Sequence, residues 1–471
     1  MAGVNGRPVV IPALQQWTGG AGEFRLGGGS RVVSRDAPEQ ARRFAAELGV
    51  PYGDAGGDVV LALTQSGRGP ESYRLEITPG RVLVEAPGPA GLFYGTRSLL
   101  QILGEDGRAP AGVAEDWPNY PVRGYMLDVG RRFVTPAMIH RLIGLMGTFK
   151  LNELQLHLND NEIKPPDGDW SRAVSAFRLR SDAFPGLAAA ESYSRADWDG
   201  FEEAAAAHAV TIVPEIDAPA HARAFIAYEP SIGHDGGDSD HLDLANPAAT
   251  KLVKEVFEEF VPWFRGPAAH FGADEYYQSK ELWKRFFNEM AAHLRSLGKQ
   301  PRAWGGFTRL SPTGDTTGFD PDVVINSWNN GFYGPEGAEG DAYPLINSND
   351  DLLYIVPEAD YYHGQGLDGA WLHEHWEPHV FAGGQSLAPD DPRLLGAMPA
   401  LWNDLVHATY GEERMYELIE DTVGVLAQKM WSASTSGLTY AEFRGRASRA
   451  LRVTTARPVP LQGFEPRTSA S

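Results

Sequence analysis

From about residue 119 onward, short apolar segments alternate with helical or loop segments, and this alternation limits the possible folds more than any other feature. The expected strands are GYMLDV (124–129), LNELQLHL (151–158), VTIVPEI (210–216), AAHFGA (268–273), RAW (302–304), VVINSW (323–328), LLYIVP (352–357) and MPALW (398–402). A strand–helix alternation of this kind predicts parallel strands covered by helices. Roughly eight strands within about 335 residues fit an α/β fold of the (β/α)8 TIM-barrel type with insertions.

Helix start signals support this pattern. Thr135-Pro136 and Asn246-Pro247 each pair a capping side chain with proline at the first helical position, and Ser194 starts a helix with Asp197 as its capping-box partner. Further helices are expected near 279–297 and 411–430. A doubly wound sheet is disfavoured, because no glycine-rich phosphate turn follows the first strand.

The first 118 residues predict a smaller α+β domain. A helix over 38–49, a strand over 58–63, a hairpin of 72–78 with 81–87, and a helix over 89–104 are expected. The Gly-, Pro- and acid-rich stretch 104–118 predicts a linker. The expected organisation is therefore an N-terminal domain with linker (1–118), a catalytic barrel (119–458) and a flexible tail (459–471).

Composition excludes several classes of function. The net charge is −21, from 41 basic and 62 acidic residues, and no basic run occurs, so no nucleic-acid partner is expected. There is no cysteine, which excludes thiolate chemistry and disulfides. No apolar stretch is long enough to predict a membrane span. The N-terminus as given lacks a leader pattern, so a cytoplasmic location is expected, with secretion after leader removal left open.

Polar and aromatic side chains gather where the expected strands end, which is the face where barrel enzymes place their active sites. They are Asp128, Arg131, His157, Asp160, Asp217, His221, His270, Asp274 and Glu275, with Trp304, Trp328, Tyr354 and Trp402 at later strands. Each alone is explained by core packing or solvation, but their coincidence at one face predicts a pocket.

Carboxylates are the best candidates for the chemistry of this pocket. HExxH, a His-x-His pair after the first strand and the GxSxG nucleophile motif are all absent, so neither a metal nor any other cofactor is expected. Glycoside hydrolysis needs two carboxyl groups, and these normally flank the scissile bond. Adjacent Asp274 and Glu275 cannot easily do so. They fit instead a 2-acetamido sugar whose own acetamido oxygen attacks C1, with Asp274 holding the acetamido nitrogen and Glu275 carrying the proton.

The quoted motifs resemble those of glycoside hydrolase family 20, the β-N-acetylhexosaminidases. HFGADE (270–275) is similar to the family's His-x-Gly-Gly-Asp-Glu signature, and RGYMLDVGRRF (123–133), LQLHLND (154–160) and VPEIDAPAH (213–221) are similar to its first three barrel strands. Residues 70–103 resemble its N-terminal domain. The resemblance implies a retaining, metal-free enzyme that hydrolyses terminal β-linked N-acetylglucosamine or N-acetylgalactosamine through an oxazolinium intermediate.

The resemblance also implies roles for individual residues. Asp274 and Glu275 match the catalytic pair, Asp160 and His221 a pair that supports the glutamate, and Tyr354 the tyrosine that aims the acetamido oxygen. Arg131 matches the arginine that grips sugar hydroxyls. Trp304, Trp328 and Trp402 match the aromatic walls. Asp404 occupies the position of the glutamate in the family's Trp-x-Glu motif. The acid role of Glu275 requires a raised pKa, expected from burial beside Asp274.

Several positions depart from the family pattern. Ala273 replaces a glycine, Asn161 and Val356 replace aspartates, Asp404 replaces a glutamate, and Gly305-Gly306 replaces an acid. The stretch LYIVP (353–357) is more similar to the branch that cuts poly-β-1,6-N-acetylglucosamine. Three alternatives therefore remain. They are a disaccharide-releasing or polymer-cutting enzyme, a non-catalytic sugar-binding protein, and a hydrolase that uses Asp128 with Glu275. Sugar preference, linkage, exo or endo action and oligomeric state are not determined by the sequence.

Overall fold

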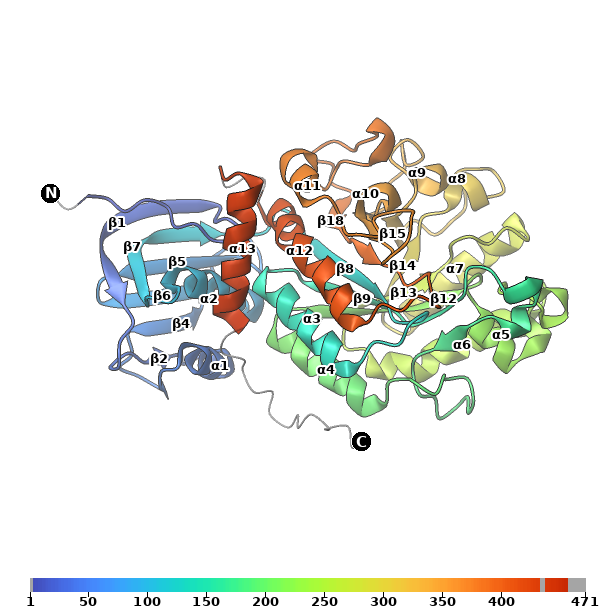
Figure 1. Cartoon of the computed structure of the whole chain (residues 1–471), viewed down its shortest axis with the longest axis horizontal. Coiled ribbons are helices and arrows are strands. Elements are labelled where there is room, and N and C mark those ends of the chain that lie inside the picture. Colours follow the sequence, from blue (N-terminus) through green and yellow to red (C-terminus); the bar gives the residue numbers. More distant parts are fainter. Residues whose placement is uncertain (1–2, 433–436, 456–471) are drawn as a thin grey trace.

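The computed structural model describes residues 3–432 and 437–455, and the tail expected from residue 459 lies outside them. A seven-stranded sheet with two helices forms the N-terminal part, and a closed parallel barrel forms the rest (Figure 1). Among the described helices, none has both the length and the apolar character needed to cross a membrane.

The N-terminal sheet has the strand order β1-β7-β5-β6-β4-β2-β3. Its strands are β1 (Gln16–Arg25), β2 (Val32–Val33), β3 (Tyr52–Gly53), β4 (Val59–Leu63), β5 (Tyr73–Thr78), β6 (Arg81–Ala86) and β7 (Arg108–Asp116), and its helices are α1 (Pro38–Leu48) and α2 (Pro89–Leu103). The predicted hairpin is confirmed, since Thr78 pairs with Arg81 across the Pro79-Gly80 turn. Gly49 ends α1 at φ 69°, a left-handed cap that glycine adopts without strain.

The linker predicted over 104–118 is wrong. Residues 108–116 form β7, which pairs antiparallel with both β1 and β5 and so lies inside the sheet. Ala109 and Ala114 belong to the core of the N-terminal part, and Ala111 is also buried. Alanine and glycine give no strong apolar alternation, so the sequence APAGVA concealed a strand that neighbouring strands stabilise.

Eight parallel strands close the barrel, as predicted. They are β8 (Val122–Asp128), β9 (Glu153–His157), β12 (Thr211–Ala218), β13 (Ala268–Gly272), β14 (Gln300–Trp304), β15 (Val324–Ser327), β16 (Leu345–Asn347) and an eighth strand in two pieces, β18 (Leu394–Ala397) and β19 (Ala400–Leu401). β8 pairs with β9 on one side and with β18 and β19 on the other, which closes the ring.

The seventh and eighth strands differ from the prediction. The seventh barrel strand is β16, a three-residue segment too short to give a recognisable pattern. The segment predicted as the seventh strand instead contributes α10 (Asp350–Leu353) and β17 (Tyr354–Ile355), which pairs with β19 beyond the ring. The predicted eighth strand, 398–402, contains β19. The prediction missed β18, which is the first piece of the same barrel strand.

Helices cover the outside of the barrel, with long ones in its first half and at its end (Figure 1). The longer ones are α3 (Pro136–Thr148), α4 (Arg195–Ala207), α6 (Pro247–Phe260), α7 (Lys280–Ser296), α12 (Glu412–Trp431) and α13 (Tyr440–Thr455), and the shorter ones are α5 (Arg223–Tyr228), α8 (Phe307–Leu310), α9 (Asn330–Tyr333) and α11 (Gly369–His375). A small hairpin of β10 (Asn159–Asn161) and β11 (Ser175–Phe177) follows β9. The capping residues Thr135, Ser194 and Asn246 act as predicted.

The N-terminal sheet is fixed to the barrel through buried polar contacts. Lys150 Nζ lies 2.9 Å from Asp116 Oδ2, and both side chains are fully buried. Trp431 Nε1 donates to the other oxygen of Asp116 at 3.0 Å. Helix α13 packs against both α2 and α3, and Figure 1 shows it standing between the two parts. A paired, hydrogen-bonded ion pair of this kind holds the two units in one orientation.

Candidate active site

The acid pair Asp274 and Glu275 lies on a sharp turn at the carboxyl end of β13. Gly272, Ala273 and Glu275 have left-handed φ angles of 70°, 69° and 47°. The amide of Ala273 donates to the carbonyl of Ala218 at 2.9 Å, which ties the turn to β12. Left-handed conformations persist in non-glycine residues only where neighbouring structure enforces them, and they cluster at functional sites. This turn lets two adjacent carboxylates face the same space.

One imidazole contacts both carboxylates. His221 Nε2 lies 3.3 Å from Glu275 Oε2 and 3.6 Å from Asp274 Oδ2. Its other nitrogen, Nδ1, lies 3.0 Å from Asp160 Oδ1. His221 therefore connects the acid pair to Asp160, which is the pairing that the sequence predicted.

Arg131 is held by three carboxylates. Its Nη1 lies 2.8 Å from Asp160 Oδ2, 3.2 Å from Asp128 Oδ2 and 3.5 Å from Asp404 Oδ1. The arginine side chain is only 3% exposed. Because the guanidinium is planar and its partners are fixed, its remaining donors have a fixed direction at the barrel mouth.

A second layer of buried groups supports this cluster from below. Glu215 Oε1 accepts a hydrogen bond from Trp304 Nε1 at 2.6 Å and lies 3.0 Å from His157 Nδ1. The other nitrogen of His157 lies 2.6 Å from Asp160 Oδ2. This series of contacts therefore fixes the positions of both Asp160 and Trp304. Glu215 is a site residue that the sequence analysis missed, although it stands within the quoted VPEIDAPAH.

Aromatic rings line the same region. The ring of Trp402 lies 5.7 Å from that of Trp304 and 5.6 Å from that of Tyr354, between centroids. Trp328 Nε1 donates to the carbonyl of Gly305, the residue after Trp304, at 3.0 Å. The structure thus brings all four predicted aromatic residues to one side of the site, and each is at most 9% exposed.

The charges at the acid pair are arranged differently from the prediction. Burial alone would raise the pKa of Glu275, but hydrogen bonding to His221 and its charge lower the pKa below its ordinary value. Burial first, and then the charge of Glu275, raise the pKa of Asp274 to about 6. The predicted raised pKa of Glu275 is therefore wrong for the unliganded site, because His221 lies closer to Glu275 than to Asp274.

His221 supplies this positive charge. Burial would lower the pKa of its imidazole, but Asp160 and Asp274 outweigh burial and raise the pKa well above its ordinary value. Burial would likewise raise the pKa of Asp160, but Arg131 and His221 lower it well below its ordinary range. The pair is therefore an imidazolium and a carboxylate at neutral pH.

Asp217 is a buried acid next to this cluster. Both of its oxygens are buried and accept no hydrogen bond from the described residues. Burial, followed by the charge of Asp274, raises the pKa of Asp217 well above its ordinary value. A buried carboxyl group without a partner is stable in its neutral form, so Asp217 is protonated here.

Two triads could in principle hold a cation, because their donor atoms lie within 4.8 Å of one another. They are His157, Glu215 and Asp217, and Asp217, His221 and Asp274. Both nitrogens of each histidine face carboxylates, and the pKa of each imidazole is raised well above its ordinary value, so neither offers a free lone pair to a metal. The donor sets fit imidazolium–carboxylate pairs better than a metal. The expectation of a metal-free site stays a prediction.

The hydrolase that would use Asp128 with Glu275 is disfavoured. Asp128 is fully buried, and its carboxylate accepts from the amides of Arg131 and Asn403 at 2.9 Å each. A carboxylate held in this way orients Arg131 and is not free to attack a substrate. Asn403 is a further supporting residue that the sequence analysis missed.

The departures from the family pattern change one side of the site. Asp404 lies near Arg131, and its Oδ2 accepts a hydrogen bond from Tyr361 at 3.2 Å. Val356 is fully buried. The backbone of Asn161 accepts from Arg131 Nε at 3.0 Å, and its side-chain oxygen accepts from the amide of Arg223. The side chain of Asn161 thus holds a neighbouring loop.

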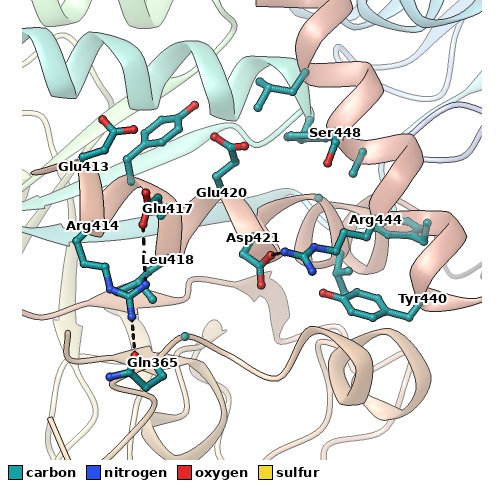
Figure 2. A pocket seen from close by; sticks show the side chains of 18 residues that line it. Gln365, Glu413, Arg414, Glu417, Leu418, Glu420, Asp421, Tyr440, Arg444 and Ser448 are labelled. Carbon is teal, nitrogen blue, oxygen red and sulfur yellow. Dashed lines mark hydrogen bonds and ion pairs between the residues drawn. The ribbon is translucent and has the colours of Figure 1, made fainter. Parts of the chain in front are cut away.

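A separate surface groove of about 510 Å³ lies between α12, α13 and the loop at Gln365. Figure 2 shows both of its arginines paired: Arg444 with Asp421, and Arg414 with Glu417 and the uncharged Gln365. None of its lining residues belongs to the cluster around Asp274. Nothing in this groove offers a catalytic arrangement.

Comparison with known proteins identifies the family. The chain matches the models "Glycosyl hydrolase family 20, catalytic domain" over residues 120–284 and "Glycosyl hydrolase family 20, domain 2" over residues 7–117. A lacto-N-biosidase of Bifidobacterium bifidum is 26% identical over 93% of this chain, and a β-N-acetylhexosaminidase of Cellulomonas fimi is 26% identical over 85% of it. This chain spans 41% and 82% of their respective lengths.

Solved structures share the fold. A mutant Streptomyces plicatus β-hexosaminidase in complex with its product N-acetylglucosamine matches with a TM-score of 0.78 at 22% identity, over 94% of this chain and 95% of that one. A β-N-acetylhexosaminidase from Bacteroides fragilis matches with a TM-score of 0.78 at 21% identity, over 96% of each chain. The barrel and the N-terminal sheet are therefore both present in these proteins.

Proposed function

The chain belongs to glycoside hydrolase family 20, and on this basis we propose that it hydrolyses terminal β-linked N-acetylhexosaminides with retention of configuration. The observation that carries the proposal is the position of His221, 3.3 Å from Glu275 and 3.6 Å from Asp274. Because the two adjacent carboxylates contact the same imidazole, they face the same space. They therefore do not stand on opposite sides of a sugar ring. They fit a substrate that supplies its own nucleophile.

The first half of the reaction breaks the glycosidic bond. The acetamido oxygen of the substrate attacks C1, and the bond between C1 and the leaving oxygen breaks while Glu275 donates its proton to that oxygen. The acetamido nitrogen gains positive charge, and the carboxylate of Asp274 stabilises it. The product of this step is an oxazolinium ion and a free alcohol.

The second half restores the enzyme. Glu275, now a carboxylate, removes a proton from a water molecule whose oxygen attacks C1. The bond between C1 and the acetamido oxygen breaks, which reopens the ring and leaves the sugar with its original configuration. Tyr354 aims the acetamido oxygen at C1, and Arg131 binds hydroxyl groups at the far edge of the ring.

The experiment is nitrophenol release from a nitrophenyl β-N-acetylglucosaminide, with the corresponding β-glucoside beside it. Turnover of the first and not the second supports the proposal, because only the first carries the acetamido group. Equal turnover of both contradicts substrate assistance. Tight competitive inhibition by a thiazoline analogue of the oxazolinium ion is the second expected result, since the analogue resembles the intermediate.

A polymer-cutting enzyme is the second candidate, and the exchange at Val356 and Asp404 favours it. Both positions usually carry longer or additional acids that grip the outer hydroxyls of a terminal sugar. Release of reducing ends from poly-β-1,6-N-acetylglucosamine, measured beside release from a chitin oligosaccharide, separates the two. Turnover of any of these substrates would exclude the third alternative, a non-catalytic sugar-binding protein.

A further inference from the structure

The segment between α5 and α6 brings two histidines to the turn that carries the acid pair. His234 begins a short 3-10 helix, His234–Gly237, and His241 follows that helix. The amide of His234 donates to the carbonyl of His241 at 3.0 Å, which joins the two residues across the loop. Both rings contact Tyr276, the residue after Glu275, with centroid distances of 6.2 Å for His234 and 5.8 Å for His241.

His241 also contacts the backbone of the acid itself. Its Nε2 lies 3.2 Å from the carbonyl oxygen of Glu275. Because a carbonyl oxygen only accepts, this contact is a hydrogen bond when Nε2 carries the proton. Glu275 has a left-handed φ of 47°, an angle that a residue with a side chain keeps only where neighbouring groups enforce it. The bond from His241 holds the peptide that follows this angle, and so helps to fix the direction of the Glu275 side chain.

Asp240 orients the imidazole of His241. Its Oδ1 lies 2.6 Å from Nδ1 of His241, and its Oδ2 accepts from Nδ2 of Asn161 at 3.4 Å. The backbone of Asp240 is fixed too, because its carbonyl accepts from the amide of Ala222 at 2.9 Å. The side chains of Asp240 and His241 are largely buried, at 16% and 18% exposed. These contacts hold the imidazole at one rotation, with Nε2 toward Glu275.

Asn161 connects this pair to the arginine of the site. Its backbone carbonyl accepts from Nε of Arg131 at 3.0 Å, while its side-chain amide donates to Asp240. An aspartate at position 161 would have no amide proton to donate and would place a second negative charge opposite Asp240. The asparagine, which stands where the family pattern has an aspartate, therefore suits the presence of Asp240 and His241.

We propose that His241 is a positioning residue for the acid Glu275, and that Asp240 and Asn161 hold it in place. A general acid must lie within hydrogen-bond reach of the leaving oxygen, and a displacement of about 1 Å can lower the rate roughly 10²-fold. His221 contacts the carboxylate of Glu275, whereas His241 acts through its backbone. This inference rests on the proposed function and adds to it the residues that aim the proton donor.

The test compares two N-acetylglucosaminides that differ in their need for an acid. One has a sugar leaving group, and the other has a dinitrophenyl group, which leaves without a proton. His241→Leu removes the donor and keeps a side chain of similar size. We expect it to lower kcat/KM about tenfold on the sugar leaving group and less than about threefold on the dinitrophenyl group. A variant that merely folds less well would lower both values by the same factor.

A rescue variant and a control locate the effect. His241→Gln keeps a nitrogen donor near the place of Nε2, so it should bring the ratio of the two kcat/KM values to within about threefold of that of the unchanged enzyme. His234→Leu is the matched control, because Nε2 of His234 lies 3.1 Å from the hydroxyl of Tyr276 on the same loop. It should leave the ratio unchanged. An equal change in the control, or no recovery with glutamine, overturns the assignment to the bond between His241 and Glu275.

A pair of exchanges tests the part of Asn161. Asn161→Asp should lower kcat/KM on the sugar leaving group, and adding Asp240→Asn restores one amide donor between the two positions. We expect the second exchange to recover at least about threefold. No recovery would overturn the link between Asn161 and Asp240.

The outcomes also separate this inference from the proposed function. Turnover of neither substrate by the unchanged enzyme overturns both. An active enzyme in which His241→Leu lowers both kcat/KM values equally overturns this inference alone.

Discussion

The imidazole of His221 lies 3.3 Å from the carboxylate of Glu275, and this contact sets the charge of the acid pair in the unliganded site. The positive charge of His221 lowers the pKa of Glu275, while burial raises the pKa of Asp274 to about 6. A single proton shared by the pair therefore favours Asp274, whereas the proposed reaction needs it on Glu275. The pair titrates as a unit, so the pH dependence of the reaction reports both carboxyl groups together.

The first prediction concerns the pH dependence of kcat/KM. Above about pH 6 the pair loses its last proton, so no acid is available and activity falls as pH rises. At low pH a second proton binds, the form with a protonated Glu275 and an ionised Asp274 disappears, and activity falls again. We expect a bell-shaped profile with an acidic optimum, measured with the nitrophenyl N-acetylglucosaminide. A flat profile from pH 6 to pH 8 would contradict this arrangement.

The second prediction concerns His221→Asn. The positive charge of His221 lowers the pKa of both Glu275 and Asp274. Without it both pKa values should rise, so both limbs of the profile should move to higher pH. The measurement is the kcat/KM profile of the variant beside that of the unchanged enzyme. A variant that loses activity but keeps the same limbs would show that His221 has only a structural role.

The third prediction separates the two carboxylates. Glu275→Gln should lower kcat/KM about 10²- to 10⁴-fold on a sugar leaving group. It should lower kcat/KM far less on a dinitrophenyl group, which leaves without a proton. Asp274→Asn should lower kcat/KM on both substrates and weaken thiazoline binding, because the positive acetamido nitrogen loses its partner.

Kinetics on the two leaving groups and the inhibition constant of the thiazoline check this assignment. Glu255→Gln is a suitable control, because its carboxylate pairs with Lys251 on the surface of α6 and contacts no site residue. Equal losses for both variants on both leaving groups would contradict the division of roles.

The fourth prediction concerns Arg131→Lys. The guanidinium contacts Asp128, Asp160 and Asp404 through Nη1 and the carbonyl of Asn161 through Nε, and a single ammonium cannot occupy both donor positions. We expect the kcat/KM of the variant to fall at least about tenfold, mainly through KM, because Arg131 binds hydroxyls in both ground and transition states. A pure loss of kcat at unchanged KM would place Arg131 in the chemical step instead.

The fifth prediction uses two neighbouring positions of the turn. A Cβ at Gly272 would lie 1.5 Å from Asp217 Oδ1, and the φ of 70° adds strain, so Gly272→Ala should destabilise the protein by about 2–4 kcal/mol. Ala273 has a similar φ of 69° but already carries its methyl group, so Ala273→Gly should change stability by less than about 1 kcal/mol. Urea unfolding measures both. Equal effects would show that close packing of Asp217 does not constrain this turn.

Much of the fold could be predicted because its signals are local. The capping residues Thr135, Ser194 and Asn246 act within one helical turn, and the hairpin at Pro79-Gly80 joins adjacent strands. The misses share a physical cause. β7 has alanine or glycine at four of its nine positions, and β16 has only three residues, so both depend on pairing with strands that are distant in the sequence.

The amino-acid sequence was enough to predict that strands alternate with helices in a barrel, although it misplaced the seventh strand, and that Arg131, Asp160, His221, Asp274 and Glu275 follow strands. Those conclusions follow from periodicity and residue type, which are properties of short segments. The folded barrel was needed to show that His221 lies closer to Glu275 than to Asp274, and that Tyr361 contacts Asp404. A pKa and a contact depend on burial and on distances between residues far apart in the chain, and these are fixed when the barrel closes.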